Sequence, residues 1–165
     1  MTIVIRQLHA DESAVYRAVR LEALTVAADY YASALEDEAG KDDAWYAANL
    51  AGSPVWVAFD GDTPIGMAGF LRQTGVKKQH KGTLWGMYVA PSVRGQGVGE
   101  SLVAAILDHA KAEGLEQVLL TCMRGNGPAV RLYERMGFIQ FGIEPNALKA
   151  SEGVYFDDVM MIRML

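Results

Sequence analysis

In the first third of the chain, the spacing of apolar residues predicts one strand and two helices. A run rich in β-branched residues from Thr2 to Arg6 predicts a first strand. A helix capped by Asp11 is expected next and extends to about Ala28. Its apolar positions are Val15, Val19, Leu21 and Leu24. After the acidic stretch 36–38, a second short helix is expected before Pro54, with apolar positions at Trp45, Ala48 and Leu50.

Three apolar segments in the middle of the chain predict an antiparallel meander. Val55–Phe59 and Ile65–Phe70 have the composition of strands, and Asp60-Gly61-Asp62 between them is typical of a hairpin turn. Thr83–Val89 is expected to form the third strand, after the polar connection 73–81.

The last third of the chain alternates between helical and strand patterns. The expected elements are a helix from Gly97 to Gly114, a strand Gln117–Thr121, a helix containing Val130, Leu132, Tyr133 and Met136, and the strands Phe138–Phe141 and Tyr155–Met164. Together these elements predict one domain over residues 1–165, an α/β (α+β) fold in which helices cover the faces of a mixed sheet.

The composition is that of a single folded domain. A chain of 165 residues can bury most of its apolar surface, and its hydrophobic fraction of 51% excludes a disordered protein. The net charge of −5 disfavours a nucleic acid as the main partner. The local exception is a basic cluster at Lys77, Lys78, His80 and Lys81. It is expected to be either a solvated hairpin tip or a patch that attracts an anionic ligand.

Cysteine content and hydropathy predict a cytoplasmic protein. Cys122 is the single cysteine and follows the apolar run Val118–Leu120, which favours a packed strand position over a nucleophile. No segment resembles a secretory signal or a membrane span, so no membrane partner is expected. No metal site is expected either, because the three histidines are far apart in the sequence.

A predicted strand that runs through a glycine-rich turn into a helix carries the strongest chemical signal. Arg94 is followed by three alternating glycines, Gly95, Gly97 and Gly99. Glycines allow a ligand to approach the backbone, and the free N–H groups and dipole of the helix start favour an anion such as a pyrophosphate. The spacing is neither G-x-G-x-x-G nor a Walker loop, so neither hydride transfer nor NTP hydrolysis is indicated.

This segment resembles the acetyl-CoA motif of the GNAT superfamily, Arg/Gln-x-x-Gly-x-Gly/Ala, which Arg94, Gly97 and Gly99 satisfy. Asn126 and residues 129–138 are similar to a second family segment, Asn…A-x-x-(L/F)-Y-x-(K/R)-x-G-F. The resemblance covers residues 55–142 and implies a mixed, mostly antiparallel sheet of six to seven strands flanked by about four helices.

The resemblance implies an N-acetyltransferase that uses acetyl-CoA as co-substrate without a metal. Tyr133 matches the family tyrosine that protonates the leaving thiolate, and an N–H group of residues 87–89 would polarise the thioester carbonyl. Asn126 would bind the pantetheine arm, although an asparagine here is also a turn former or helix cap. The implied cofactor-binding residues are Met87, Tyr88, Val89, Arg94, Gly95, Gln96, Gly97, Val98, Gly99, Glu100, Asn126, Ala129 and Tyr133.

The acceptor amine and the general base stay open. Many relatives carry a glutamate on the third strand where this chain has Thr83, so an acidic residue, His80 or a water chain is expected to take the proton. The candidate substrate-binding residues are Tyr30, Tyr31, Glu36, Glu38, His80 and Tyr155. The acidic run 36–38 suggests a cationic amine such as a polyamine or an aminoglycoside.

Several alternatives concern the partner and the activity. The acceptor is expected to be a small-molecule or protein amine, and the apolar run Val159–Ile162 permits a homodimer through late strands. A CoA-binding module without transferase activity is the alternative to the enzyme, because Thr83 occupies the usual glutamate position. Acetylation of a charged tRNA or a ribosomal protein is disfavoured by the acidic net charge.

Overall fold

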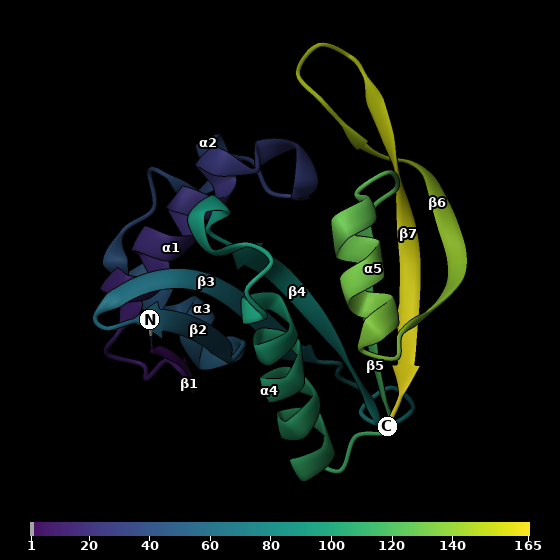
Figure 1. The fold of residues 1–165 in the computed structure, drawn as a ribbon, viewed down its shortest axis with the longest axis horizontal. Coiled ribbons are helices and arrows are strands. Elements are labelled where there is room, and N and C mark those ends of the chain that lie inside the picture. Colours follow the sequence, from purple (N-terminus) through teal and green to yellow (C-terminus); the bar gives the residue numbers. More distant parts are fainter. Residues whose placement is uncertain (1) are drawn as a thin grey trace.

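The computed structural model describes residues 2–165 and contains one sheet of seven strands (Figure 1). In spatial order the strands are β1 (Ile3–Gln7), β2 (Val55–Asp60), β3 (Thr63–Arg72), β4 (Lys81–Val89), β5 (Gln117–Met123), β7 (Tyr155–Met164) and β6 (Ile139–Lys149). Every neighbouring pair is antiparallel except β4 and β5, which are parallel. The expected mixed, mostly antiparallel α/β fold is confirmed.

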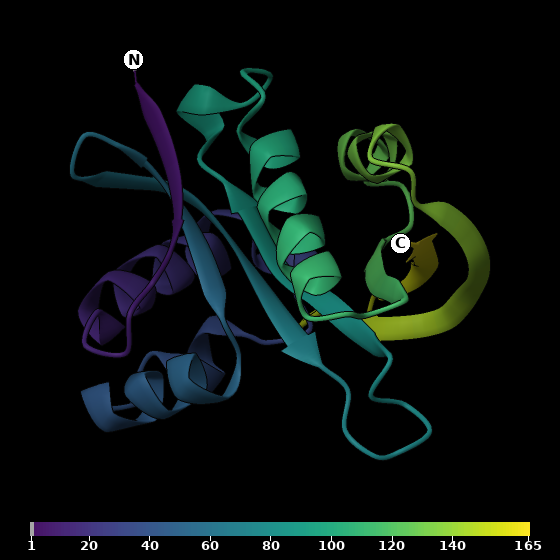
Figure 2. The same cartoon turned by 90° about the horizontal axis from the view of Figure 1, so that it is seen from below.

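Helices cover both faces of the sheet. Within residues 2–165 the α-helices are α1 (Ser13–Val26), α2 (Leu35–Glu38), α3 (Asp43–Gly52), α4 (Val98–Ala112) and α5 (Gly127–Arg135). Figure 2 shows α1 and α3 on one side of the central strands and α4 on the other. No helix in this part of the chain combines the length and apolar character needed to cross a membrane.

The position of α4 is fixed by its apolar face. Leu102, Val103 and Ile106 are fully buried, and α4 contacts the strands from β1 to β5. Complete burial of each such side chain contributes about 1.5–3 kcal/mol. The glycine-rich turn at the start of α4 is therefore held in a defined place at the end of β4.

Two expectations about the N-terminal helices are wrong in detail. Asp11 does not cap α1, which begins after Glu12. The Glu12 carboxylate instead accepts hydrogen bonds from the guanidinium of Arg6 at 2.6 and 2.9 Å and from the backbone N–H of His9 at 2.8 Å. The acidic stretch 36–38, expected to interrupt the helical pattern, belongs to the short helix α2.

The predicted strand Phe138–Phe141 is much longer than expected. It begins at Ile139 and extends to Lys149 as β6, with two irregularities in its pairing with β7. Pro145 and Asn146, which has a φ of 52°, lie in the second irregular stretch. The bulged pairing breaks the two-residue alternation, so spacing alone could not follow the strand through this region.

A bulge in β4 decides which side chains face α1 and α3. β3 pairs Met67 with Tyr88 but Gly69 with Trp85, so β4 contains one extra residue between these pairs. Gly86 in this stretch has a φ of 64°, a left-handed conformation that glycine adopts without steric cost. As a result, Trp85 and Tyr88 both project toward α1 and α3, where each donates a hydrogen bond.

β4 and β5 separate before β4 reaches its bulge. Their parallel pairing covers only Lys81–Thr83 and Gln117–Leu119. Beyond it, β4 continues beside β3 and β5 continues beside β7, and the two strands diverge toward the start of α5 (Figure 1). The end of β4 therefore borders an opening in the sheet, next to the glycine-rich turn.

Candidate active site

The turn between β4 and α4 places a guanidinium and two left-handed glycines next to a helix start. Gly95 and Gly97 have φ values of 77° and 81°, and α4 begins at Val98. Arg94 Nε donates to the carbonyl oxygen of Val89 at 3.1 Å, which keeps the arginine beside the end of β4. Because the first N–H groups of a helix lack intrahelical partners, this turn can bind an anionic group.

A groove with a volume of about 470 Å³ joins this turn to β4 and α5. Its lining from the strand and the turn includes Met87, Tyr88, Val89, Arg94, Gly95 and Gly97. Its lining from the two helices and the residue before α5 includes Val98, Gly99, Glu100, Asn126 and Ala129. The fold thus gathers most residues that were expected to bind the cofactor. Gln96 is an exception, and its side-chain amide donates to the carbonyl oxygen of Ser92 at 3.4 Å.

Tyr133 is buried and does not line the groove. Its side chain is 4% exposed and packs edge-on against Phe138, with 5.9 Å between the ring centroids. Burial raises the pKa of Tyr133 well above its usual value, and the neighbouring Cys122 and Tyr31 add smaller contributions. The phenol therefore keeps its proton at neutral pH.

Tyr30 and Tyr31, expected at the acceptor site, line the same groove. The Tyr31 hydroxyl donates to the carbonyl oxygen of Met87 at 2.7 Å, which ties the segment after α1 to the bulged part of β4. Burial raises the pKa of Tyr31 to about 12, so its hydroxyl remains a donor. Tyr31 thereby forms the wall of the groove on the side of α1.

Three arginines give the groove a positive character, although the chain as a whole is acidic. Arg94, Arg131 and Arg135 all line it, and Arg135 is paired with Glu100 at 2.5 Å. Arg131 and Arg135 were not expected in the site. Their spacing of four residues in a predicted helix, which places both on one face, was the available signal. Such a cluster attracts phosphate groups.

Asn126 both lines the groove and caps a helix. Its side-chain oxygen accepts a hydrogen bond from the N–H of Ala129 at 3.4 Å, as the N-cap of α5. Its side-chain amide nitrogen makes no hydrogen bond within residues 2–165 and can donate to a ligand. The capping role considered from the sequence is therefore compatible with a binding role.

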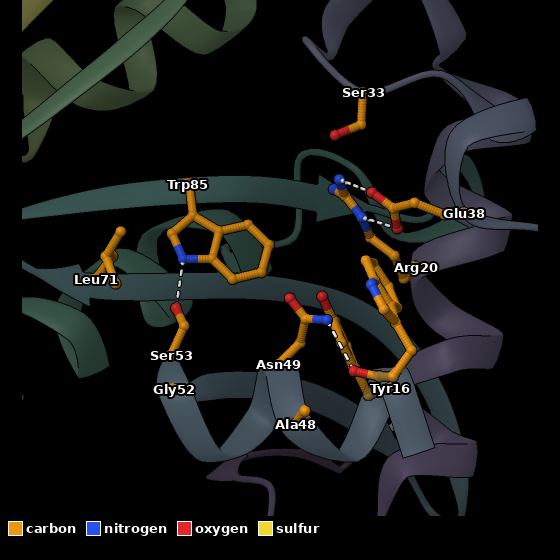
Figure 3. Close-up of a pocket in the computed structure, with 11 residues that line it drawn as sticks. Tyr16, Arg20, Ser33, Glu38, Ala48, Asn49, Gly52, Ser53, Leu71 and Trp85 are labelled. Atoms are coloured by element: carbon orange, nitrogen blue, oxygen red, sulfur yellow. Dashed lines mark hydrogen bonds and ion pairs between the residues drawn. The ribbon is translucent and has the colours of Figure 1, made fainter. Parts of the chain in front are cut away.

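A second cavity, with a volume of about 630 Å³, lies between α1, α3 and β4 (Figure 3). Tyr16, Trp45 and Trp85 supply its aromatic surface, and Asn49 adds a polar group. Trp85 Nε1 donates to the hydroxyl of Ser53 at 2.8 Å, which fixes the indole in place. No local pattern in the sequence indicates this cavity, because its residues come from separate elements that meet only in the fold.

A buried ion pair between α1 and α2 forms one wall of this second cavity. Arg20 and Glu38 are each 5% exposed, and the guanidinium donates to both carboxylate oxygens. Glu38 was among the expected acceptor-site residues, whereas Arg20 was not. Arg20 directly follows the apolar position Val19, on the face of α1 that packs inward. A charged residue at such a position is unusual unless it is paired, and this was the signal that could have identified Arg20.

The remaining expected acceptor-site residues join neither cavity. Glu36 is exposed on α2. His80 precedes β4, at the end remote from the glycine-rich turn, where its carbonyl oxygen accepts the N–H of Glu116. Tyr155 lies in the hairpin of β6 and β7, with Lys149 over its ring. Within residues 2–165, no three histidine, cysteine or acidic side chains gather as metal ligands.

A model of the acetyltransferase (GNAT) family matches residues 20–138, which include the turn, the groove and α5. The chain belongs to the GNAT acetyltransferase family. Among its relatives is the streptothricin acetyltransferase of Streptomyces lavendulae, 34% identical over 101 residues, which are 60% of this chain and 51% of that protein. The mycothiol acetyltransferase of Streptosporangium roseum is 40% identical over 63 residues, which are 38% of this chain and 19% of that protein. The matched part of the chain thus spans about a fifth of the length of the mycothiol acetyltransferase and about half of the length of the streptothricin acetyltransferase.

Solved structures of GNAT proteins have the same fold over nearly the whole chain. A GNAT acetyltransferase from Streptococcus pneumoniae has a TM-score of 0.88 at 20% identity, covering 99% of this chain and 100% of that one. A Salmonella typhimurium protein, solved with its cofactor acetyl-CoA, has a TM-score of 0.81 at 23% identity, covering 100% of this chain and 95% of that one. These structures confirm the GNAT fold that the two sequence motifs predicted.

Proposed function

We propose that this chain transfers the acetyl group of acetyl-CoA to a primary amine by direct attack in a ternary complex. The observation that carries the proposal is the continuous groove from the glycine-rich turn, past the open end of β4, to α5. Its chemistry fits each part of the co-substrate. The turn and the arginines suit the phosphates, and the apolar surface beside β4 suits the pantetheine arm.

The residues of the groove have distinct roles in this proposal. Arg94 and the N–H groups around Gly97 bind the pyrophosphate, and the backbone of Met87 and Tyr88 positions the thioester. Holding the thioester and the amine together supplies much of the rate enhancement. Tyr133, which stays protonated, donates a proton to the departing thiolate.

A second candidate function is a CoA-binding module that no longer transfers an acyl group. It is favoured by the environment of the carboxylates at the two cavities. Glu100 is paired with Arg135, and Glu38 is paired with Arg20. Thr83, at the usual glutamate position, offers only a hydroxyl, which accepts a weak hydrogen bond from Gln73 at 3.5 Å. Neither carboxylate is thus free to act as a base toward an ammonium group.

Calorimetric titration with acetyl-CoA, followed by a coupled assay of CoA release over a panel of amines, separates these functions. The transferase requires both binding and amine-dependent CoA release. Arg94→Ala is expected to weaken acetyl-CoA binding by about tenfold or more, since it removes a charged hydrogen-bond donor worth roughly 1.5–3 kcal/mol. Binding without turnover on any amine would favour the module, and absence of binding would exclude both functions.

A further inference from the structure

The cavity between α1, α3 and β4 has a surface suited to a flat, apolar group. Trp85 is held rigidly by its bond to Ser53, and Trp45 packs edge-on against Tyr46 with 4.9 Å between ring centroids. Gly69 lies directly under the Trp85 ring, so the indole rests on β3 with no intervening side chain. Rigid aromatic walls bind planar rings with little loss of side-chain entropy.

This cavity adjoins the groove at the bulge of β4. The Arg20 guanidinium carbon is 5.6 Å from the ring centroid of Trp85, in the cavity, and 5.6 Å from that of Tyr31, in the groove. One residue, Gly86, separates Trp85 from Met87, and Arg20 Nη1 lies 3.5 Å from the position that a Cβ atom on Gly86 would take, so the guanidinium borders the junction of the cavity and the groove. A ligand body against Trp85 would direct one end along this guanidinium toward the backbone of Met87.

The charges around the cavity argue against a polycationic occupant. Its one carboxylate, on Glu38, has both oxygens bonded to Arg20. The other acidic residues of the run 36–38 do not line it, and Asp37 accepts the backbone N–H of Ala34 at 2.9 Å. A ligand with several ammonium groups would leave them without counter-charges in this cavity, which costs free energy. The expectation of a polyamine or an aminoglycoside thus finds no support here.

We propose that this cavity binds the body of the acceptor, and that the acceptor is a primary monoamine carried on an aromatic group. This inference rests on the proposed acetyl transfer. The aromatic group would pack against Trp85 and Trp45, and the amine would reach past Gly86 to the thioester beside Met87. Asn49, whose side-chain oxygen has no hydrogen-bond partner within residues 2–165, would accept a hydrogen bond from a polar substituent on the ring.

The same cavity accounts for proton removal without a dedicated base. An ammonium group that reaches the junction of the cavity and the groove is partly removed from water and finds no free carboxylate there, because Glu38 is bonded to Arg20, so its pKa falls and water can accept its proton. The amine nitrogen then forms a bond to the acetyl carbonyl carbon, and the C–S bond breaks. Of the two protons that the ammonium group loses, one reaches solvent and the other ends on the CoA thiol.

Indole NMR signals provide a test that does not depend on catalysis. The chain has three tryptophans, and their Nε1–H groups give three separate resonances. Trp45 and Trp85 line the cavity, whereas Trp56 is buried and packs against His109 of α4. Titration with 2-phenylethylamine in the absence of acetyl-CoA is expected to shift the first two resonances and leave that of Trp56 unchanged. Equal shifts at all three tryptophans, or none, would overturn the assignment of the site.

Steady-state kinetics then test the acceptor class. At saturating acetyl-CoA, kcat/KM is expected to be at least about tenfold higher for 2-phenylethylamine and tryptamine than for spermidine, because only the aromatic amines bury apolar surface in the cavity. Trp85→Leu is expected to raise KM for 2-phenylethylamine about tenfold while the Kd of acetyl-CoA stays within about twofold. The control is Phe141→Leu, another exchange of an aromatic residue for leucine, at an exposed residue of β6, and it should change neither constant.

Failure of this inference can be distinguished from failure of the proposed function. Preference for spermidine, with acetyl-CoA binding and turnover intact, would overturn the aromatic acceptor but leave acetyl transfer standing. Unchanged kinetics in Trp85→Leu would also overturn it. Absence of acetyl-CoA binding would remove the proposed function and, with it, the role of the cavity as an acceptor site.

Discussion

Arg20 and Glu38 meet at the junction of α1 and α2 in a two-point ion pair, with N–O distances of 3.0 and 2.8 Å. The hydroxyl of Tyr46, from α3, donates to the backbone oxygen of Glu38 at 2.8 Å. The pair therefore holds three helices around the second cavity. Since both side chains are almost fully buried, neither charge has water as an alternative partner.

Removing one charge of this pair should strongly destabilise the protein. Glu38→Gln leaves the guanidinium of Arg20 buried without a counter-charge, and we expect a loss of about 3–5 kcal/mol in the free energy of unfolding. The double variant Arg20→Met/Glu38→Leu should lose less, because it buries no unpaired charge. Urea denaturation measures both variants. A double variant as unstable as the single one would contradict this explanation.

An exposed ion pair provides the control for that experiment. Arg17 and Asp43 join α1 and α3 at 3.0 Å, with side chains 38% and 74% exposed. Solvent screens this pair, so Asp43→Asn should cost less than about 1 kcal/mol. A loss comparable to that of Glu38→Gln would mean that the contact between the helices, rather than burial of the charge, determines the effect.

Tyr133→Phe should slow catalysis without unfolding the protein. The hydroxyl has no hydrogen-bond partner within residues 2–165, so the melting temperature should change little. Loss of a general acid typically lowers the rate by about 10²–10⁴-fold, and kcat should fall in that range. Because its pKa is raised, Tyr133 stays protonated. The kcat of the wild type should therefore not decrease through ionisation of Tyr133 up to about pH 10. An unchanged kcat in the variant would show that water protonates the thiolate.

Much of the cofactor groove could be predicted because its residues follow one another in the chain. The turn from Arg94 to Gly99 is a local pattern that could be read from the chain, and Gly95 and Gly97 adopt left-handed conformations within it. Helical spacing likewise predicted α4 and α5. Where a function depends on consecutive residues, local physical rules are sufficient to locate it.

The second cavity could not be predicted in the same way. Arg20, Glu38 and Trp85 are far apart in the sequence and meet only in the folded chain, where Arg20 donates to Glu38 and its guanidinium carbon lies 5.6 Å from the ring centroid of Trp85. Judged alone, Glu38 belongs to an acidic run that is typical of a solvated surface. Its burial depends on an arginine 18 residues away, and such long-range pairing leaves no periodic pattern in the sequence.

The position of the Trp85 ring should depend on the absence of a side chain at residue 69. A Cβ atom at Gly69 would overlap the indole, so Gly69→Ala should displace the ring and destabilise the protein by about 1–3 kcal/mol. The Trp85 Nε1–H resonance should shift, and binding of 2-phenylethylamine should weaken. Gly40→Ala is the matched control, because nothing lies within 4 Å of its added Cβ. A Trp85 resonance that does not move would contradict the packing described.

Two neighbouring aspartates in β7 should have opposite effects on stability. The Asp157 carboxylate accepts the N–H of Asn146 at 2.9 Å and a hydrogen bond from Arg124 at 3.2 Å, which lower its pKa. Asp158 has one buried carboxylate oxygen that finds no hydrogen-bond partner among residues 2–165. Burial, with a smaller contribution from Glu144, raises its pKa. The folded state therefore favours the charged form of Asp157 and the neutral form of Asp158.

The sign of each effect follows from proton linkage. The stability supplied by Asp157 is present above the unfolded pKa of about 3.9 and is lost as the pH falls through its lower folded pKa. For Asp158, the folded state binds the proton more tightly, so stability decreases as the pH rises from about 3.9 through the folded pKa. At neutral pH, Asp157→Asn should thus lower the melting temperature, and Asp158→Asn should raise it.

Melting temperatures of both variants and the wild type, measured between pH 2 and pH 7, test this pair. The two differences from wild type should have opposite signs at pH 7 and should shrink as each carboxyl group becomes neutral, first for Asp158 and at lower pH for Asp157, whose folded pKa is lowered. A decrease for Asp158→Asn at pH 7 would mean that its charged form has a favourable partner in the folded protein. A difference for Asp157→Asn that stays constant over the whole pH range would assign its effect to hydrogen bonding rather than to charge.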